Sequence, residues 1–235
     1  MGYTEYCNST VIANGLPGFS TAKNYNYEKN LKKGYPLNFE FQTKLTYGYL
    51  TKPDDYSELN NPYHHAELSL GSFWSYRVIV SKVEIEAGRG VLFNVLAGYN
   101  SGFKFNDNYF AHLQPYGNWL LMPSAKIGLK YQLNKIKLKT KLIFPLCVGG
   151  FYQEYQNYPY IEDKIITHVF TPNTLALFNK YRAVYAEMNC YIPIDLNSTK
   201  KNEFIIGIYI DSTNGSINYI SEKKQNIGIS LGVQF

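Results

Sequence analysis

Apolar residues stand at every second position in eight segments of this chain. The pattern is clearest at the C-terminus, where small and polar residues alternate with Ile227, Ile229, Leu231, Val233 and Phe235. A period of two predicts a β-strand, because successive side chains of a strand point to opposite faces of its sheet. Each segment therefore has one apolar and one polar face, and the sequence predicts an all-β fold.

The connections between the segments alternate in length. The eight predicted strands cover residues 37–50, 65–80, 83–99, 119–133, 136–148, 182–194, 203–211 and 227–235. Only Ser81-Lys82 and Asn134-Lys135 separate two of the pairs, and a two-residue connection predicts a hairpin. Longer connections, the last of them through Asn214-Gly215, lie between the short ones. Short turns on one rim and long loops on the other are typical of a closed, antiparallel, up-and-down β-barrel.

The last strand, NIGISLGVQF, ends on Phe235 and resembles the closing strand of bacterial outer-membrane β-barrel proteins. This resemblance implies a transmembrane barrel of the Gram-negative cell envelope, with short periplasmic turns and long extracellular loops. It also implies export by a signal peptide that the sequence does not contain. The implied partners are the outer-membrane lipids, lipopolysaccharide and phospholipid. We expect the last strand to close an eight-stranded barrel against residues 37–50.

Composition limits the alternatives. No run of about 18 apolar residues exists, so a transmembrane helix is excluded. The net charge of +5 is spread along the chain without a basic block, which argues against nucleic acid as a partner. A soluble barrel or sandwich is the competing fold. Against it, the apolar faces carry large side chains, with Trp and Tyr near the strand ends as in an aromatic girdle.

Two regions depart from the pattern. Residues 1–35 form a separate N-terminal extension ahead of the barrel of residues 36–235, and three roles are open for it: a periplasmic segment, a plug, or an extra strand pair that would give ten strands. Arg89 falls on an apolar face. Because Gly88 and Gly90 flank Arg89, we expect a β-bulge that turns its side chain away from that face.

The strongest catalytic candidates are His65, Glu67 and Ser69, which share a polar face near the long-loop rim. Outer-membrane lipid hydrolases use Ser, His and an acidic group at such a rim. However, residues two apart on a strand are about 6.5–7 Å from each other, too far for a direct contact between the serine and the histidine. We therefore expect no enzymatic activity and keep a lipid-modifying hydrolase as an alternative.

Other residue groups suggest binding rather than catalysis. The lysine row Lys137, Lys139 and Lys141 forms an anion path or is neutralised by Glu187 and Glu203. The loop tyrosines Tyr152, Tyr155, Tyr158 and Tyr160 either form a binding surface, pack the loops together or lie at the level of the lipid headgroups.

No cofactor or metal site is expected, because His112 and His168 stand alone. Cys147 and Cys190 point to opposite faces by strict alternation, which argues against a disulfide. The sequence thus favours a structural or interaction role, through the loops or as an accessory subunit of an envelope complex. A hydrolase and a small porin-like pore are the alternatives.

Overall fold

The structure is a computed structural model, and all its regular elements are β-strands. It describes residues 2–8, 12–30, 36–50, 63–100, 103–105, 108–110, 116–152, 171–172, 176–177, 181–194, 202–217 and 220–234. Within these ranges no helix is long and apolar enough to cross a membrane. The strands are β1 (Gly2–Asn8), β2 (Ile12–Asn30), β3 (Leu37–Leu50), β4 (Tyr63–Val80), β5 (Val83–Asn100), β6 (Phe103–Phe105), β7 (Asn108–Phe110), β8 (Tyr116–Leu133), β9 (Ile136–Pro145), β10 (Cys147–Tyr152), β11 (Thr171–Pro172), β12 (Ala176–Leu177), β13 (Tyr181–Pro193), β14 (Glu203–Ile217) and β15 (Ile220–Gln234).

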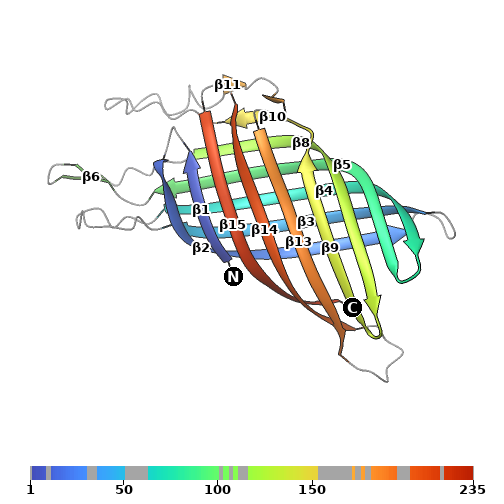
Figure 1. The fold of residues 1–235 in the computed structure, drawn as a ribbon. Coiled ribbons are helices and arrows are strands. Elements are labelled where there is room, and N and C mark those ends of the chain that lie inside the picture. The colour runs from blue at the N-terminus through green and yellow to red at the C-terminus, as the bar shows by residue number, and fades with distance from the viewer. Residues whose placement is uncertain are drawn as a thin grey trace.

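The long strands form an antiparallel, nearly closed barrel of nine to ten strands (Figure 1). Neighbouring strands follow the order β8-β5-β4-β3-β2-β1-β15-β14-β13-β9, and β9 pairs in turn with β8. The hairpins predicted at Ser81-Lys82 and Asn134-Lys135 are confirmed. Ser81 and Asn134 adopt positive φ angles of 58° and 53° there. These turns mark the short-turn rim. The pair of Leu50 with Tyr63, at the other ends of β3 and β4, marks the opposite, long-loop rim.

The barrel has more strands than the expected eight, in line with the alternative of an extra strand pair in residues 1–35, and the closing pair differs from the prediction. The expected pairing of the last strand with residues 37–50 is wrong, because β1 and β2 lie between β15 and β3. These two strands come from residues 1–35, where the apolar alternation is too weak to reveal them. Asn214 and Gly215, expected in a long loop, are instead paired inside the hairpin of β14 and β15. The expectation for Phe235 lies outside the described residues.

Burial in this barrel is the reverse of burial in a soluble protein. The outer face carries exposed large apolar side chains on all the long strands, among them Trp74, Ile127 and Leu231. The interior instead buries charged and polar groups such as Glu40 and Lys126. Soluble proteins place charged groups outside and rarely bury them unpaired. The apolar faces predicted from the alternation therefore point outward.

One break shifts this alternation. The pairings Ser124↔Pro145 and Leu121↔Gly149 leave one extra residue between β9 and β10, which is a β-bulge. At the bulge the Leu146 amide donates to the Pro123 carbonyl at 2.8 Å. The strand resumes in the opposite phase, so Val148 is 0% exposed and lies inside. Strict alternation along the predicted strand of residues 136–148 would place Val148 outside with Leu146, and the bulge makes this position wrong.

The bulge expected at Arg89 is also wrong. Pairing of β4 with β5 runs through Trp74↔Arg89 without a shift, and Arg89 is exposed on the outer face. The flanking glycines have another function. A Cβ at Gly90 would overlap the carbonyl oxygen of Ser72 on β4, so this position needs glycine for the close approach of two backbones.

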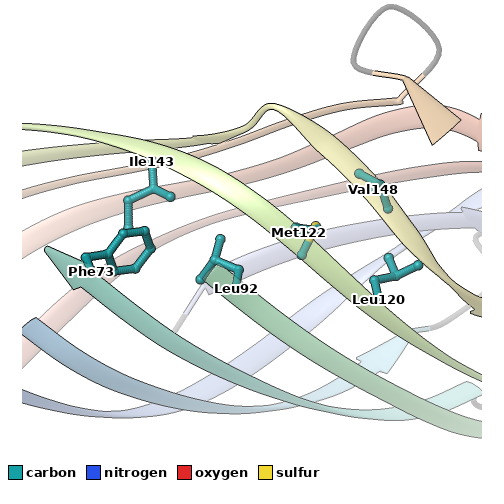
Figure 2. Close-up of a cluster of buried hydrophobic side chains, with 6 residues drawn as sticks. All are labelled: Phe73, Leu92, Leu120, Met122, Ile143 and Val148. Atoms are coloured by element: carbon teal, nitrogen blue, oxygen red, sulfur yellow. The ribbon is translucent and has the colours of Figure 1, made fainter. Parts of the chain in front are cut away.

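A small apolar cluster lies inside the barrel among the polar groups. Figure 2 shows its members, which come from β4, β5, β8, β9 and β10: Phe73, Leu92, Leu120, Met122, Ile143 and Val148. Most of them sit in the polar phase of their strands, and Val148 enters through the bulge. Part of the interior is therefore apolar. Charged groups such as Lys126 on β8 and Lys141 on β9 come from the same strands.

Candidate functional site: the charged interior

A buried lysine stands at the centre of the interior. Lys126 on β8 pairs with Glu40 on β3 and, at 3.1 Å, with Glu86 on β5. All three side chains are fully buried. Glu86 also accepts from Lys130 at 3.0 Å, which gives this carboxylate a second cation. A buried charge is tolerated only when it is paired and hydrogen-bonded, and these groups meet that condition.

The lysine row of β9 joins the same network. Lys141 lies 3.0 Å from Glu40 and 3.4 Å from Glu187, and Lys139 pairs with Glu28 on β2. Lys137 pairs with Glu203 at 2.5 Å. The predicted neutralisation by Glu187 and Glu203 is confirmed.

The contributions of Glu28 and Glu40 were not foreseen. Their strands face β9 across the interior, and local sequence patterns report only neighbours within a sheet. The lysine row is consequently a neutralised part of the interior rather than an anion path.

A second charged group lies nearer the long-loop rim. Lys224 on β15 donates to both carboxylate oxygens of Glu67 at 2.7 Å and lies 3.4 Å from Asp211. Asp211 on β14 also accepts from Lys44 at 2.9 Å. Pairs such as Lys126–Glu40 and Lys224–Glu67 join strands that are not neighbours in the sheet. These ion pairs therefore cross the interior and tie opposite walls together.

The space left between these groups is small. A cavity of about 50 Å³ lies between the apolar cluster and the Lys44–Asp211 pair. Its lining includes Ser69, Asn94 and Tyr185. Because a buried water needs about 10–15 Å³ by this measure, the cavity has room for a few waters but not for a sugar or an acyl chain.

The candidate catalytic residues share the inner face of β4 but are engaged in different contacts. Glu67 is held by Lys224 and by Asn94 at 3.5 Å. His65 is buried, and its ring occupies the space that a side chain at position 48 would need. Ser69 is half-buried and lines the small cavity. A catalytic triad needs its acidic member oriented toward the histidine, whereas this carboxylate is occupied by a lysine.

The other predicted sites add no chemistry to the interior. Tyr155, Tyr158 and Tyr160 lie outside the described residues, and of Tyr152 only the backbone, in β10, is described. Cys147 and Cys190 are free. In the described part of the chain no group of three or more His, Cys, Asp or Glu residues is placed to hold a metal ion. His112 and His168 also fall outside that part.

Comparison of the sequence with protein-family models and with curated proteins found no match.

Proposed function

We propose that the chain is an integral β-barrel of a bacterial outer membrane, with a structural or interaction role and no catalytic activity. The observation that carries the proposal is the reversed burial. Large apolar side chains cover the outer face, while charged groups fill the inside. In water such an outer face would be an apolar patch far larger than monomeric proteins expose. In a bilayer the same face is favourable, and a barrel pairs its backbone groups within itself.

The filled interior supports a structural or interaction role over a pore or a hydrolase. A pore needs a continuous aqueous path, whereas ion pairs and the apolar cluster cross this lumen. A hydrolase needs an assembled nucleophile and base, whereas Glu67 is held by Lys224. An interaction through the outer surface or the loops needs neither an aqueous path nor an assembled nucleophile and base. An accessory subunit of an envelope complex fits this description.

The two tryptophans allow a direct test of the membrane location. Trp74 and Trp119 are the only tryptophans, and both lie on the outer face, 47% and 43% exposed. We expect brominated phospholipids to quench the fluorescence of both, measured one at a time in Trp74→Phe and Trp119→Phe. Protein that is soluble without detergent, unquenched by these lipids, and unchanged in gel mobility on heating would contradict the proposal.

Location and role need separate measurements. Expression in a Gram-negative host behind a signal peptide should place the protein in the dense outer-membrane fraction of a sucrose gradient. Mild detergent extraction should then recover a partner in a fixed ratio if the role is interaction. Recovery in the inner-membrane fraction would refute the outer-membrane assignment. Release of fatty acid from lipopolysaccharide or phospholipid, lost in His65→Ala, would refute the non-enzymatic role.

A further inference from the structure

Arg89 is a charged residue on the apolar outer face of the barrel. Its backbone pairs with Trp74 on β4 and with Ala125 on β8, and its side chain is exposed. The outward positions on either side of it in β5 are Ala87 and Val91, both apolar. An arginine within the apolar face of a membrane strand is unfavourable unless its charge reaches an anion or water. Arg89 is therefore a candidate binding residue.

The described outer face contains no acidic partner for this arginine. The carboxylates whose side chains the structure describes all face inward and pair there with a lysine or an arginine. They are Glu28, Glu40, Glu67, Glu84, Glu86, Glu187, Glu203 and Asp211. None of these ion pairs includes Arg89. An anion for Arg89 therefore comes from outside the described residues.

The position of Arg89 along β5 places it in the half of the wall next to the short turns. It lies six residues after Val83, and the strand continues for eleven residues beyond it. With about 3.3 Å per residue and a strand tilt of about 40°, the Cα of Arg89 lies about 15 Å from the short-turn rim. Trp74 lies at the same level and Tyr76 nearer the rim, 47% and 58% exposed. Tryptophan and tyrosine are enriched at the level of lipid headgroups.

The neighbours of Arg89 leave room for its side chain to extend toward that rim. Ala87, the next outward residue toward the turn, is small and exposed, so the arginine stem has space above it. The ring of Trp74 packs against Phe39 on β3, with centroids 5.5 Å apart, and so leans away from β5. Tyr76 pairs with Ala87 and borders the same space. The guanidinium group can therefore reach the headgroups of the leaflet at the short-turn rim.

We propose that Arg89, bordered by Trp74 and Tyr76, binds the phosphate of one phospholipid in the leaflet at the short-turn rim. The proposal deepens the membrane location proposed above and rests on it. A guanidinium group donates two parallel N–H bonds to two phosphate oxygens. The carboxylate of a membrane-embedded partner is a poorer fit, because at the level of Trp74 and Tyr76 the lipids already supply phosphates.

Selective quenching of Trp74 fluorescence tests the proposal. The reporter protein carries Trp119→Phe, which leaves Trp74 as its one tryptophan. It is folded into vesicles of equal parts phosphatidylglycerol and galactosyl diacylglycerol, of which only one is brominated on its chains. The galactolipid has the same chains but no phosphate. Arg89→Gln and Arg89→Lys are compared in this reporter. The matched control is Lys29→Gln, which removes one positive charge beside Phe39 on the same outer face.

We expect Trp74 to be quenched as though phosphatidylglycerol were about threefold enriched beside it, the selectivity of a partly exposed ion pair. The enrichment should disappear in Arg89→Gln, persist in part in Arg89→Lys and stay unchanged in Lys29→Gln. Equal losses in Arg89→Gln and Lys29→Gln would indicate general attraction by surface charge and would overturn the site.

The remaining outcomes separate the site from the membrane location. Quenching of the reporter in proportion to the bulk lipid composition would refute the phosphate site alone. Absence of quenching by either brominated lipid would refute the membrane location as well. A partner protein that co-purifies with the natural chain and is lost in Arg89→Gln, without any phosphate selectivity, would assign Arg89 to a partner's carboxylate and overturn the proposal.

Discussion

At the scale of single residues, Lys126 is a fully buried charge that depends on its ion-pair partners. Its ammonium lies between the carboxylates of Glu40 and Glu86, all fully buried. The substitution Lys126→Met removes the cation that the two buried carboxylates share and leaves Glu40 with Lys141 and Glu86 with Lys130. Breaking a buried pair in this way costs about 3–5 kcal/mol. We expect that loss in the free energy of unfolding, measured by urea titration of the protein folded in lipid vesicles.

The matched control is another lysine of the same interior face. Lys137 pairs with Glu203 at 2.5 Å, but its side chain is 43% exposed. Solvent screens such a pair, so Lys137→Met should cost about 1 kcal/mol or less. Equal losses for the two variants would show that burial of the Lys126 network is not what stabilises the barrel.

Interior glycines provide a second prediction at this scale. A Cβ at Gly48 would overlap the imidazole ring of His65, whereas a Cβ at Gly232 would meet its nearest neighbour, Ile205, at 3.8 Å. Overpacking of a filled interior costs about 1–3 kcal/mol. We expect Gly48→Ala to destabilise the barrel by that amount and Gly232→Ala to leave it nearly unchanged. Unfolding midpoints in urea measure both.

A double variant isolates the cause of that loss. If the ring of His65 is the obstacle, His65→Ser should restore much of the stability that Gly48→Ala removes. The coupling free energy of the two positions would then differ from zero by more than the measurement error. Additive effects would mean that the alanine disturbs the backbone of β3 rather than the histidine.

At the scale of elements, sequence periodicity predicted the long strands well and their exceptions poorly. Strand β3 occupies the predicted range, Leu37–Leu50. Strands β1 and β2 were only one of three alternatives for residues 1–35, because these residues show little alternation. The bulge after Pro145 and the regular pairing at Arg89 were both missed, because glycine and proline positions do not specify how a neighbouring backbone approaches.

The interior was predictable only in part. Alternation shows that Lys141 and Glu187 face the same side, and their strands are neighbours. It does not show that Lys126 contacts Glu40. Strands β3 and β8 are not neighbours, and they face each other only because the whole sheet curves into a barrel. The apolar cluster was missed for a similar reason. Each of its members looks like an isolated exception within its own strand.

The bulge between β9 and β10 predicts side-chain orientations that differ from those of strict alternation. Leu146 lies outside and Val148 inside, although they are two residues apart. In a background without the natural cysteines, Leu146→Cys should react with a membrane-permeant maleimide, whereas Val148→Cys should be protected until the protein unfolds. Labelling is measured by mass spectrometry. Equal labelling of both cysteines would mean that the bulge is absent and that Val148 faces outward.

At the scale of the whole molecule, the interior combines two kinds of filling. The members of the apolar cluster come from β4, β5, β8, β9 and β10, and ion pairs tie opposite walls together. Side chains can fill the interior of a barrel of about eight strands, whereas porins of about 16–18 strands leave an aqueous channel, and this barrel of nine to ten strands is close to the smaller size. Every carboxylate named in the two groups has at least one lysine partner. The described part of the molecule is thus a nearly closed barrel with a largely filled interior and an apolar outer face.

Because side chains fill its interior, we expect the barrel to conduct no ions. Purified protein inserted into planar bilayers should give no discrete current steps, because Lys126 and Glu40 join β8 to β3 across the lumen. The double variant Glu40→Ala, Lys126→Ala removes one charge of each sign from that crossing. It should give small current steps where the unchanged protein gives none, with insertion of both verified by protease protection. Steps of equal size in the unchanged protein would show that water and ions pass the network, and would favour a pore over the interaction role.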